Sequence, residues 1–232
     1  ELLLTYCRAI SRGDTFGGKS ARALYRNSML YCVPLVNPDG ADLVAGAIPA
    51  ASPEYVQAAA IAAVFPQIPF PDGWKANLRG VDLNLNYPAS WELAKEIKGS
   101  LGFDRAAPRD FPGKKPLDQR ETAALAAYTA CIRPDILLAY HTQGRVIYPG
   151  GRALGPPGAK NLAEQFSEAS GYAVEDVPPE SSNAGFKDWF LRRFHRPGFT
   201  IEAGLGENPL PLSQLPQLIR ENEPLLAAAL TD

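Results

Sequence analysis

Two side chains that could do chemistry stand at the ends of short apolar runs. Glu202 closes the run GFTIE at residues 198–202, and glycine and proline soon follow it. A carboxylate at the end of a buried strand is costly to desolvate unless it has a use. His141 closes the run ILLAYH at residues 136–141, and we expect residues 136–140 to form a buried strand. Because ligands of open α/β sheets bind at the carboxyl ends of strands, we expect His141 and Glu202 to meet at one edge of a sheet.

The chain has two histidines, and their settings differ. His195 lies in the basic segment RRFHRP at the end of a helix, where a cation complements the helix dipole, so we interpret it as a surface residue. His141, at the end of an apolar strand, could be a buried, hydrogen-bonded histidine or a metal ligand. Its immediate sequence leaves both interpretations open.

Helices and short strands alternate along the chain. The patterns predict helices at 1–10, 54–64, 119–131, 158–170, 184–194 and 212–230, and strands at 29–36, 136–140 and 198–202. Pro/Gly-rich loops are expected at 65–80 and 99–117. This alternation predicts an α/β fold whose sheet is covered by helices on both faces.

Several local signals support these boundaries. The first helix has apolar residues at helical spacing, namely Leu3, Leu4, Cys7 and Ile10. The segment 37–40, NPDG, is a strong turn signal after the apolar strand 29–36. Asp118, with Glu121 three residues later, is expected to cap the helix that begins at residue 119.

Composition limits the possible classes. The chain of 232 residues is 46% hydrophobic, which is enough for one sizeable core, so we expect one domain. The formal net charge of −2 gives no nucleic-acid footprint, and no apolar run is long enough to cross a bilayer. The three cysteines lie in apolar segments without a CxxC pair, which predicts reduced, buried thiols and a cytoplasmic location.

Four blocks of the sequence resemble the zinc carboxypeptidases. They are PLVNPDG (34–40), WKANLRGVDLN (74–84), YHTQGRVIYPG (140–150), and GFKDWF (185–190) leading into FTIEAGLGENPLP (199–211). Each block alone is weak, but GVDLN, HTQG and FTIEAG in this order form a specific combination. The nearest branch is the bacterial one that cleaves γ-D-glutamyl–diaminopimelate bonds in peptidoglycan peptides. The resemblance implies a mixed, mostly parallel sheet in an α/β/α sandwich, a zinc cofactor, and a peptide substrate of the cell-wall muropeptide type.

The resemblance also implies roles for individual residues. His141 matches a zinc-binding histidine at a strand end. Glu202 matches the general base that takes a proton from zinc-bound water and delivers it to the leaving amine. Asn84 matches the asparagine that holds the substrate carboxylate. Lys75 and Arg79 are alternatives for the cation that stabilises the oxyanion.

Two positions bear on specificity. Leu85 stands where true C-terminal carboxypeptidases have an arginine that clamps the terminal carboxylate, so action on ordinary C-termini is not expected. Lys187 matches a position on the floor of the pocket for the residue that leaves on the C-terminal side. An ammonium there would pair with an acidic group such as the extra carboxylate of diaminopimelate.

Half of the family's metal site has no counterpart in this chain. The His-x-x-Glu motif that provides two zinc ligands does not occur in the sequence. In relatives it lies just before a helix like ELLLTYCRAI, so the N-terminal strands and this motif are expected to be missing. A truncated chain, a separate upstream segment, and a metal-free relative that binds peptides in the same cleft are the three explanations. The last is the alternative function. A serine hydrolase is not supported, because no G-x-S-x-G motif is present.

Overall fold

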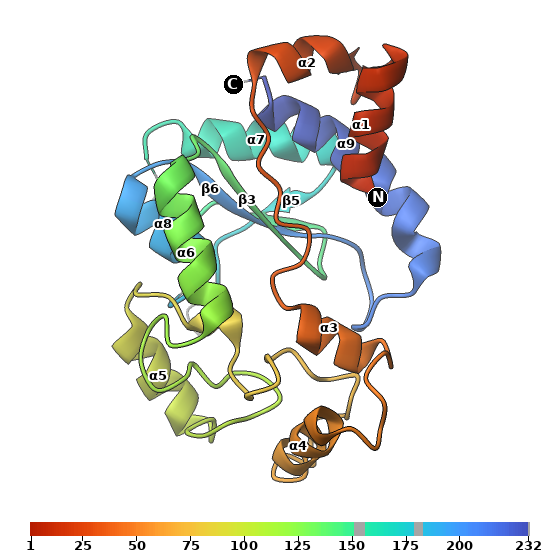
Figure 1. Ribbon diagram of the computed structural model, residues 1–232. Helices are drawn as coiled ribbons and strands as arrows, with labels where there is room; N and C mark the ends of the chain where they lie inside the picture. Colours follow the sequence, from red (N-terminus) through yellow and green to blue (C-terminus); the bar gives the residue numbers. More distant parts are fainter. Residues whose placement is uncertain (151–155, 179–182, 232) are drawn as a thin grey trace. The chain divides into compact units, whose positions relative to one another are not determined.

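The structure is a computed structural model that describes residues 1–150, 156–178 and 183–231 (Figure 1). The chain divides into two compact units. The first unit comprises Glu1–Val33, Ile136–Asp176 and Arg196–Asp232, and the second comprises Pro34–Asp135 and Val177–His195. The expectation of one domain stays a prediction. No helix among the described residues is long and apolar enough to cross a membrane.

The first unit is built on a mixed four-stranded sheet. Its strands, in spatial order, are β3 (Leu137–His141), β6 (Gly198–Glu202), β4 (Val146–Tyr148) and β5 (Ala173–Val174). The pairs β3–β6 and β4–β5 are parallel, whereas β4 and β6 are antiparallel. The predicted α/β class with a mixed, mostly parallel sheet is confirmed.

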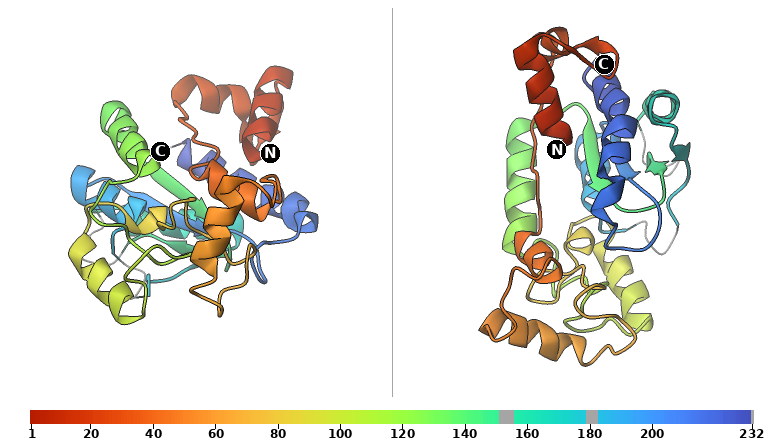
Figure 2. Two further views of the ribbon diagram at one scale, coloured as in Figure 1. Left: turned by 60° about the horizontal axis from the view of Figure 1, so that its bottom comes forward. Right: turned by 90° about the vertical axis from the view of Figure 1, so that its right-hand side faces the viewer.

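Helices α7 (Ala159–Ser170) and α9 (Leu215–Ala229) pack together and against this sheet (Figure 1, Figure 2). A short 3-10 turn, Leu212–Gln214, precedes α9. Phe199 and Ile201 of β6 are fully buried among side chains of both helices, and the rings of Phe166 and Phe199 meet edge to face with centroids 4.9 Å apart. Because side chains alternate along a strand, burial of Phe199 and Ile201 turns Thr200 and Glu202 to the opposite face. Helices over that face remain a prediction.

A second cluster of the first unit lies at the chain's beginning. It involves α1 (Leu2–Arg12), the strand pair β1 (Thr15–Phe16) and β2 (Lys19–Ser20), and α2 (Ala21–Asn27). The predicted first helix is confirmed, but its predicted apolar face is partly wrong. Tyr6 and Ala9 are buried, whereas Leu4 and Cys7 are exposed, because α1 packs against α9 through Tyr6 and Ala9.

The second unit consists of helices joined by long loops, and its described residues contain no strand. The helices are α3 (Pro38–Val44), α4 (Pro53–Ala62), α5 (Trp91–Ser100), α6 (Arg120–Ile132) and α8 (Phe186–Phe194), with a 3-10 turn at Leu83–Leu85. The predicted helices that correspond to α4, α6 and α8 are confirmed, as are the loops at 65–80 and 99–117 apart from the end of α5. The sequence patterns did not reveal α5.

The predicted strand at 29–36 is wrong. The segment is exposed and forms neither helix nor strand, and the Met29 side chain is 74% exposed. A β-prone run becomes a strand only when a neighbour supplies hydrogen bonds, and no described segment does so here. The predicted turn at 37–40 instead begins α3, because Asn37 Oδ1 accepts a hydrogen bond from Gly40 N at 3.2 Å.

Three further expectations need correction. Asp118 does not cap α6; the cap position is Gln119, and the Asp118 carboxylate instead accepts a hydrogen bond from Lys114 N at 2.9 Å. Strand β3 is only partly buried, with Tyr140 42% exposed. The three cysteines are free, as expected of reduced thiols, but they are exposed rather than buried.

Candidate active-site residues

His141 and Glu202 lie side by side at one edge of the sheet. The parallel register of β3 and β6 pairs them directly, and the His141 carbonyl accepts a hydrogen bond from Ala203 N at 2.9 Å. Paired residues of parallel strands lie on the same face of the sheet. Both side chains are therefore on the face opposite Phe199 and Ile201, away from α7 and α9. The expectation that these two strand ends meet is confirmed.

The loops that follow the two strands are tied to each other. Gly144 N donates a hydrogen bond to Gly204 O at 2.8 Å, and Asn208 Nδ2 donates one to Thr142 O at 3.1 Å. Gly204 has φ +82°, a left-handed backbone conformation that favours glycine. The backbone around His141 and Glu202 is thus held by contacts on both sides.

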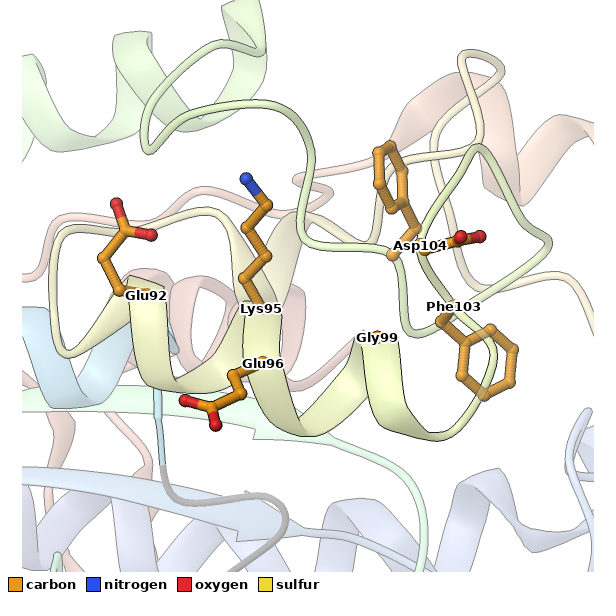
Figure 3. A pocket seen from close by; sticks show the side chains of 7 residues that line it. Glu92, Lys95, Glu96, Gly99, Phe103 and Asp104 are labelled. Atoms are coloured by element: carbon orange, nitrogen blue, oxygen red, sulfur yellow. The ribbon is translucent and has the colours of Figure 1, made fainter.

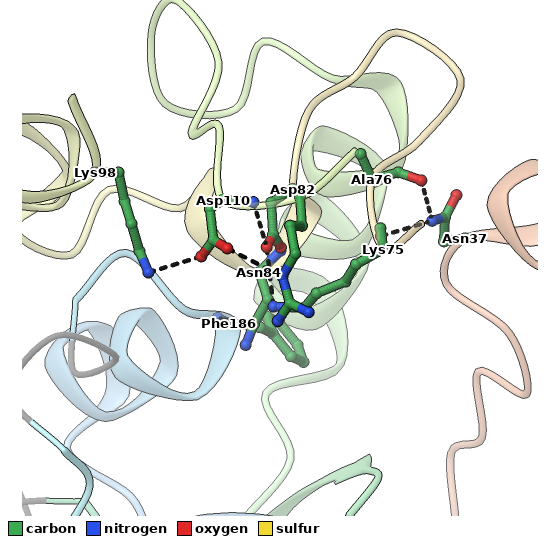
Figure 4. Close-up of polar contacts among 9 residues, drawn as sticks. Asn37, Lys75, Ala76, Asp82, Asn84, Lys98, Asp110 and Phe186 are labelled. Carbon is green, nitrogen blue, oxygen red and sulfur yellow. Dashed lines mark hydrogen bonds and ion pairs between the residues drawn. The ribbon is translucent and has the colours of Figure 1, made fainter. Parts of the chain in front are cut away.

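In the second unit a buried carboxylate, Asp82, joins three parts of the chain (Figure 4). Its Oδ2 lies 2.9 Å from Lys75 Nζ and accepts a hydrogen bond from Asp110 N at 3.3 Å. Its Oδ1 accepts a hydrogen bond from Asn84 N at 3.1 Å. Two residues with expected roles, Lys75 and Asn84, are therefore held by a single side chain.

Of the two candidate cations, Lys75 lies in this cluster. Burial lowers the pKa of Lys75, but the neighbouring Asp82 carboxylate raises it by a larger amount. The pKa therefore lies above its ordinary value, and the ammonium stays charged at neutral pH. Arg79 is exposed, and its backbone N donates to Asn77 Oδ1 at 3.1 Å. The geometry near Asn84 favours Lys75 over Arg79.

Asn84 connects this cluster to the start of α8. Its Oδ1 accepts a hydrogen bond from Phe186 N at 3.1 Å, which fixes the side-chain amide and leaves Nδ2 as a donor (Figure 4). The next residue, Leu85, is buried in the protein interior. Position 85 therefore provides no positively charged side chain for binding a carboxylate.

Lys187 is buried rather than solvated, with 5% of its surface exposed. Its Nζ lies 3.6 Å from Asp188 Oδ1. Burial lowers the pKa of Lys187, and the neighbouring carboxylate only partly offsets this. A lysine on a solvated helix face would not show this environment, so Lys187 has a structural or binding role inside the unit.

A buried polar framework supports the turn that carries Asn84. Asn86 is fully buried, and its Nδ2 donates to Pro112 O and to Asp118 Oδ1, both at 2.8 Å. Its Oδ1 accepts from Thr122 Oγ1 at 2.7 Å. The sequence arguments missed Asp82 and Asn86, and they gave Asp118 a different role, as the cap of α6. The signal was the alternation in VDLNLN, where polar residues at 82, 84 and 86 separate buried leucines.

The described residues do not form a zinc site by themselves. No group of three or more His, Cys, Asp or Glu side chains among them is arranged to hold a metal ion. A catalytic zinc needs three protein ligands, and His141 supplies one imidazole. Zinc binding by the described residues alone therefore has no structural support.

An open hollow of about 470 Å³ lies beside α5 in the second unit (Figure 3). Its lining residues are Glu92, Lys95, Glu96, Gly99, Phe103, Asp104 and Phe111. None of the residues with expected roles lines it. We therefore do not assign the active site to this hollow.

Comparison with known proteins agrees with the sequence blocks. The family model described as zinc carboxypeptidase matches residues 14–224. Gamma-D-glutamyl-L-diamino acid endopeptidase 1 of Lysinibacillus sphaericus is 42% identical over 216 residues, which are 93% of this chain and 52% of that protein. The uncharacterized protein YqgT of Bacillus subtilis (strain 168) is 37% identical over 225 residues, or 97% of this chain and 58% of that protein. The chain thus spans little more than half the length of these relatives.

Among solved structures, carboxypeptidase A from Helicoverpa armigera shares the fold. It superposes with a TM-score of 0.56 at 19% identity and covers 85% of this chain and 49% of that one. The expected carboxypeptidase-like architecture is confirmed by this likeness, and the matched residues of the family model include every residue with an expected role. The chain belongs to the zinc carboxypeptidase family.

Proposed function

We propose that the full-length protein is a zinc-dependent peptidase that cleaves the amide between a γ-linked D-glutamyl residue and a diamino acid. The observation that carries this proposal is the direct pairing of His141 with Glu202, on the face of the sheet opposite Phe199 and Ile201. Membership of the family supports the reaction class, and the name of the 42% identical relative supports the bond. The substrate would be a cell-wall muropeptide.

Glu202 is the proposed general base. Its carboxylate takes a proton from the attacking water as the water oxygen bonds to the carbonyl carbon, and it gives the proton to the amine nitrogen as the C–N bond breaks. Zinc, when bound, would act as a Lewis acid and lower the pKa of a bound water to about 7. We propose His141 as one of its ligands.

Lys75, Asn84 and Lys187 are the proposed binding residues of the second unit. Lys75 keeps its charge and is restrained by Asp82, as a cation that stabilises an oxyanion should be. Asn84 offers Nδ2 to a substrate carboxylate. Arg79 is the weaker candidate for the oxyanion because it lies outside the Asp82 cluster.

The second candidate function is a metal-free peptide-binding protein. It is favoured by the lack of a three-ligand group among the described residues. Such a protein would bind peptides through the same residues and would turn none over. The two candidates therefore differ in zinc content and in catalysis, and one experiment separates them.

The test uses the full-length protein with Glu202→Gln, His141→Ala and His195→Ala. Elemental analysis after dialysis should find zinc in the wild type and Glu202→Gln but not in His141→Ala. Hydrolysis by Glu202→Gln should fall by several orders of magnitude because proton transfer is lost while the fold is kept. The exposed His195 is the matched control and should change neither property.

Wild-type protein without zinc and without turnover would instead establish the peptide-binding alternative. Equal zinc in the wild type and His141→Ala would remove His141 from the metal site. Near-normal turnover by Glu202→Gln would mean that another residue takes the proton.

We further propose a cytoplasmic location, on the ground that all three cysteines are free although exposed. Exposed thiols remain reduced most readily in a reducing compartment. Neither nucleic acid nor membrane is proposed as a partner, because the net charge of −2 gives no electrostatic attraction to either polyanion.

A further inference from the structure

We propose that Arg109 completes a carboxylate-binding site with Lys75 and Asn84, and that this site binds the free α-carboxylate of a γ-linked glutamyl residue. This inference rests on the proposed function, since it names the substrate group that the second unit recognises. None of the sequence arguments assigned a role to Arg109.

The backbone places Arg109 next to Lys75. Lys75 N and Ala76 N both donate to Pro108 O, each at 2.8 Å, and Asp82 N donates to Phe111 O at 2.8 Å. Residues 75–82 and 108–111 are therefore joined by hydrogen bonds at both ends. Arg109 lies between these two connections and directly follows Pro108, whose carbonyl accepts the hydrogen bond from Lys75 N.

The Arg109 side chain is held by a hydrogen bond at Nε, while its terminal NH2 groups remain accessible. Its Nε donates to Asp110 Oδ2 at 3.0 Å, and the side chain is 47% exposed. Asp110 is itself fixed, because its Oδ1 lies 2.7 Å from Lys98 Nζ and its N donates to Asp82 (Figure 4). Among the described residues only Nε of Arg109 has a polar partner, so both terminal NH2 groups are available to a ligand. A carboxylate is the group that a guanidinium binds through two parallel hydrogen bonds.

The charges of the cluster also favour an anion. Three cations, Lys75, Lys98 and Arg109, face two carboxylates, Asp82 and Asp110, which leaves one net positive charge. Lys98 is largely buried, so the positive charge open to solvent belongs to Lys75 and Arg109. Arg109 lowers the pKa of Lys75, as expected of two neighbouring like charges, although Asp82 outweighs this effect. A bound anion would relieve the repulsion.

Linkage chemistry identifies the carboxylate. A glutamyl residue linked through its γ-carbonyl keeps its α-carboxylate free, whereas an α-linked residue has that carboxyl in the peptide bond. Binding of the α-carboxylate therefore separates γ-linked from α-linked substrates. Leu85 is buried and apolar and gives this site no cation, so the guanidinium that we propose for it is that of Arg109.

The test compares two peptides that differ in one group. Both have a γ-D-glutamyl–diamino acid bond; one carries the α-carboxylate and the other the α-carboxamide. For the wild-type full-length protein we expect kcat/KM to be roughly tenfold to a hundredfold higher with the carboxylate, as for a hydrogen bond to a charged group. Arg109→Gln should lose most of that preference by losing activity on the carboxylate peptide alone. Arg109→Lys should be intermediate because it keeps the charge without the fork.

Arg105→Gln is the matched control, since Arg105 is exposed, pairs with Asp104 and lies on the same loop. It should keep the wild-type preference. An equal loss on both peptides in Arg109→Gln, or no loss on either, would overturn the inference. Arg109→Lys with the full wild-type preference would also overturn the forked geometry.

Binding distinguishes this failure from failure of the proposed function. Isothermal titration of both peptides into Glu202→Gln should show the same preference for the carboxylate without turnover. If the wild type cleaves neither peptide but binding still discriminates between them, the proposed function fails and the carboxylate site stands. If the peptides are cleaved but bound without discrimination, only the carboxylate site fails.

Discussion

At the scale of single residues, Lys187 shows how burial sharpens a sequence argument and also changes it. The sequence suggested an ammonium that would seek an acidic group of the substrate. The structure gives that ammonium a partner of its own, Asp188, at 3.6 Å. The distance is longer than a charge-assisted hydrogen bond, and burial still lowers the pKa of Lys187. Lys187 is thus incompletely compensated, which is compatible with a further negative charge from a ligand.

Lys187→Met should therefore reduce the preference for an acidic leaving residue. In the full-length protein we expect kcat/KM for γ-D-glutamyl–diaminopimelate peptides to fall roughly tenfold to a hundredfold, the worth of a charge-assisted hydrogen bond. Peptides ending in Phe or Leu, which bring no second carboxylate, should be affected much less. Steady-state kinetics on both peptide types measures the ratio.

Lys95→Met is the control for this change, because Lys95 is an exposed helix lysine that stacks on Trp91 with its Nζ 5.0 Å from the ring centroid. For Lys95→Met, the ratio of kcat/KM between the two peptide types should equal that of the wild type. An unchanged ratio in Lys187→Met would make Lys187 a structural partner of Asp188 and remove it from specificity.

At the scale of elements, periodicity predicted helices well and strands less well. Helices such as α7 and α8 are specified by local spacing of apolar residues, which the sequence displays directly. Strand β6 was also predictable, because it is bounded by glycine and buried on one face. The run at 29–36 has the composition of a strand, but the prediction of a strand there was wrong, because a strand depends on a neighbouring strand that the sequence does not identify.

Polar side chains inside the second unit were the least predictable part of the site. Asp118 was expected to cap α6, but its carboxylate instead accepts four hydrogen bonds, from Lys114 N, Lys115 N, Asn86 Nδ2 and Gln119 Nε2. Three of them come from its own loop and one from the turn of Asn86. Which hydrogen bonds the Asp118 carboxylate accepts depends on how the loop at 112–118 folds back, and the local sequence does not encode that.

Asp118→Asn should loosen this loop and the turn beside it. Burial raises the pKa of Asp118, but the hydrogen bonds from Gln119, Lys114 and Asn86 outweigh it, so the net pKa lies below its ordinary value. The carboxylate therefore adds stability above the ordinary aspartate pKa, and this is lost as the pH falls through the folded-state value. At pH 7 the free energy of unfolding of the variant should be about 1–3 kcal/mol lower than that of the wild type.

Thermal unfolding measured from pH 7 down to pH 2.5 checks this prediction. The difference between wild type and Asp118→Asn should shrink at the acidic end, where both side chains are neutral. Asp104→Asn is the control, because Asp104 and its partner Arg105 are exposed and such pairs contribute little. A difference that stays constant across the pH range would exclude the charged hydrogen bonds as its cause.

At the scale of the whole molecule, the residues with proposed roles divide between the two units. His141 and Glu202 belong to the first unit, whereas Lys75, Asn84 and Lys187 belong to the second. The order of the four sequence blocks along the chain indicated the family but not this division. It arises because the second unit is formed by two separated segments of the chain, and long-range contacts of this kind are not visible as a local pattern.

The one-sided pairing of β3 has a consequence for handling the protein in solution. Among the described residues β3 is paired only with β6, and the apolar run at 29–36, in another part of the chain, is exposed. Unpaired strand edges and bare apolar segments are templates for intermolecular pairing. Residues 1–232 alone should thus have a low colloidal stability, with light scattering that rises steeply with concentration. Met29→Lys should raise the concentration at which association begins more than Leu212→Lys, a still more exposed apolar site elsewhere in the chain. A poor yield of this polypeptide would then reflect intermolecular association of the folded protein rather than misfolding.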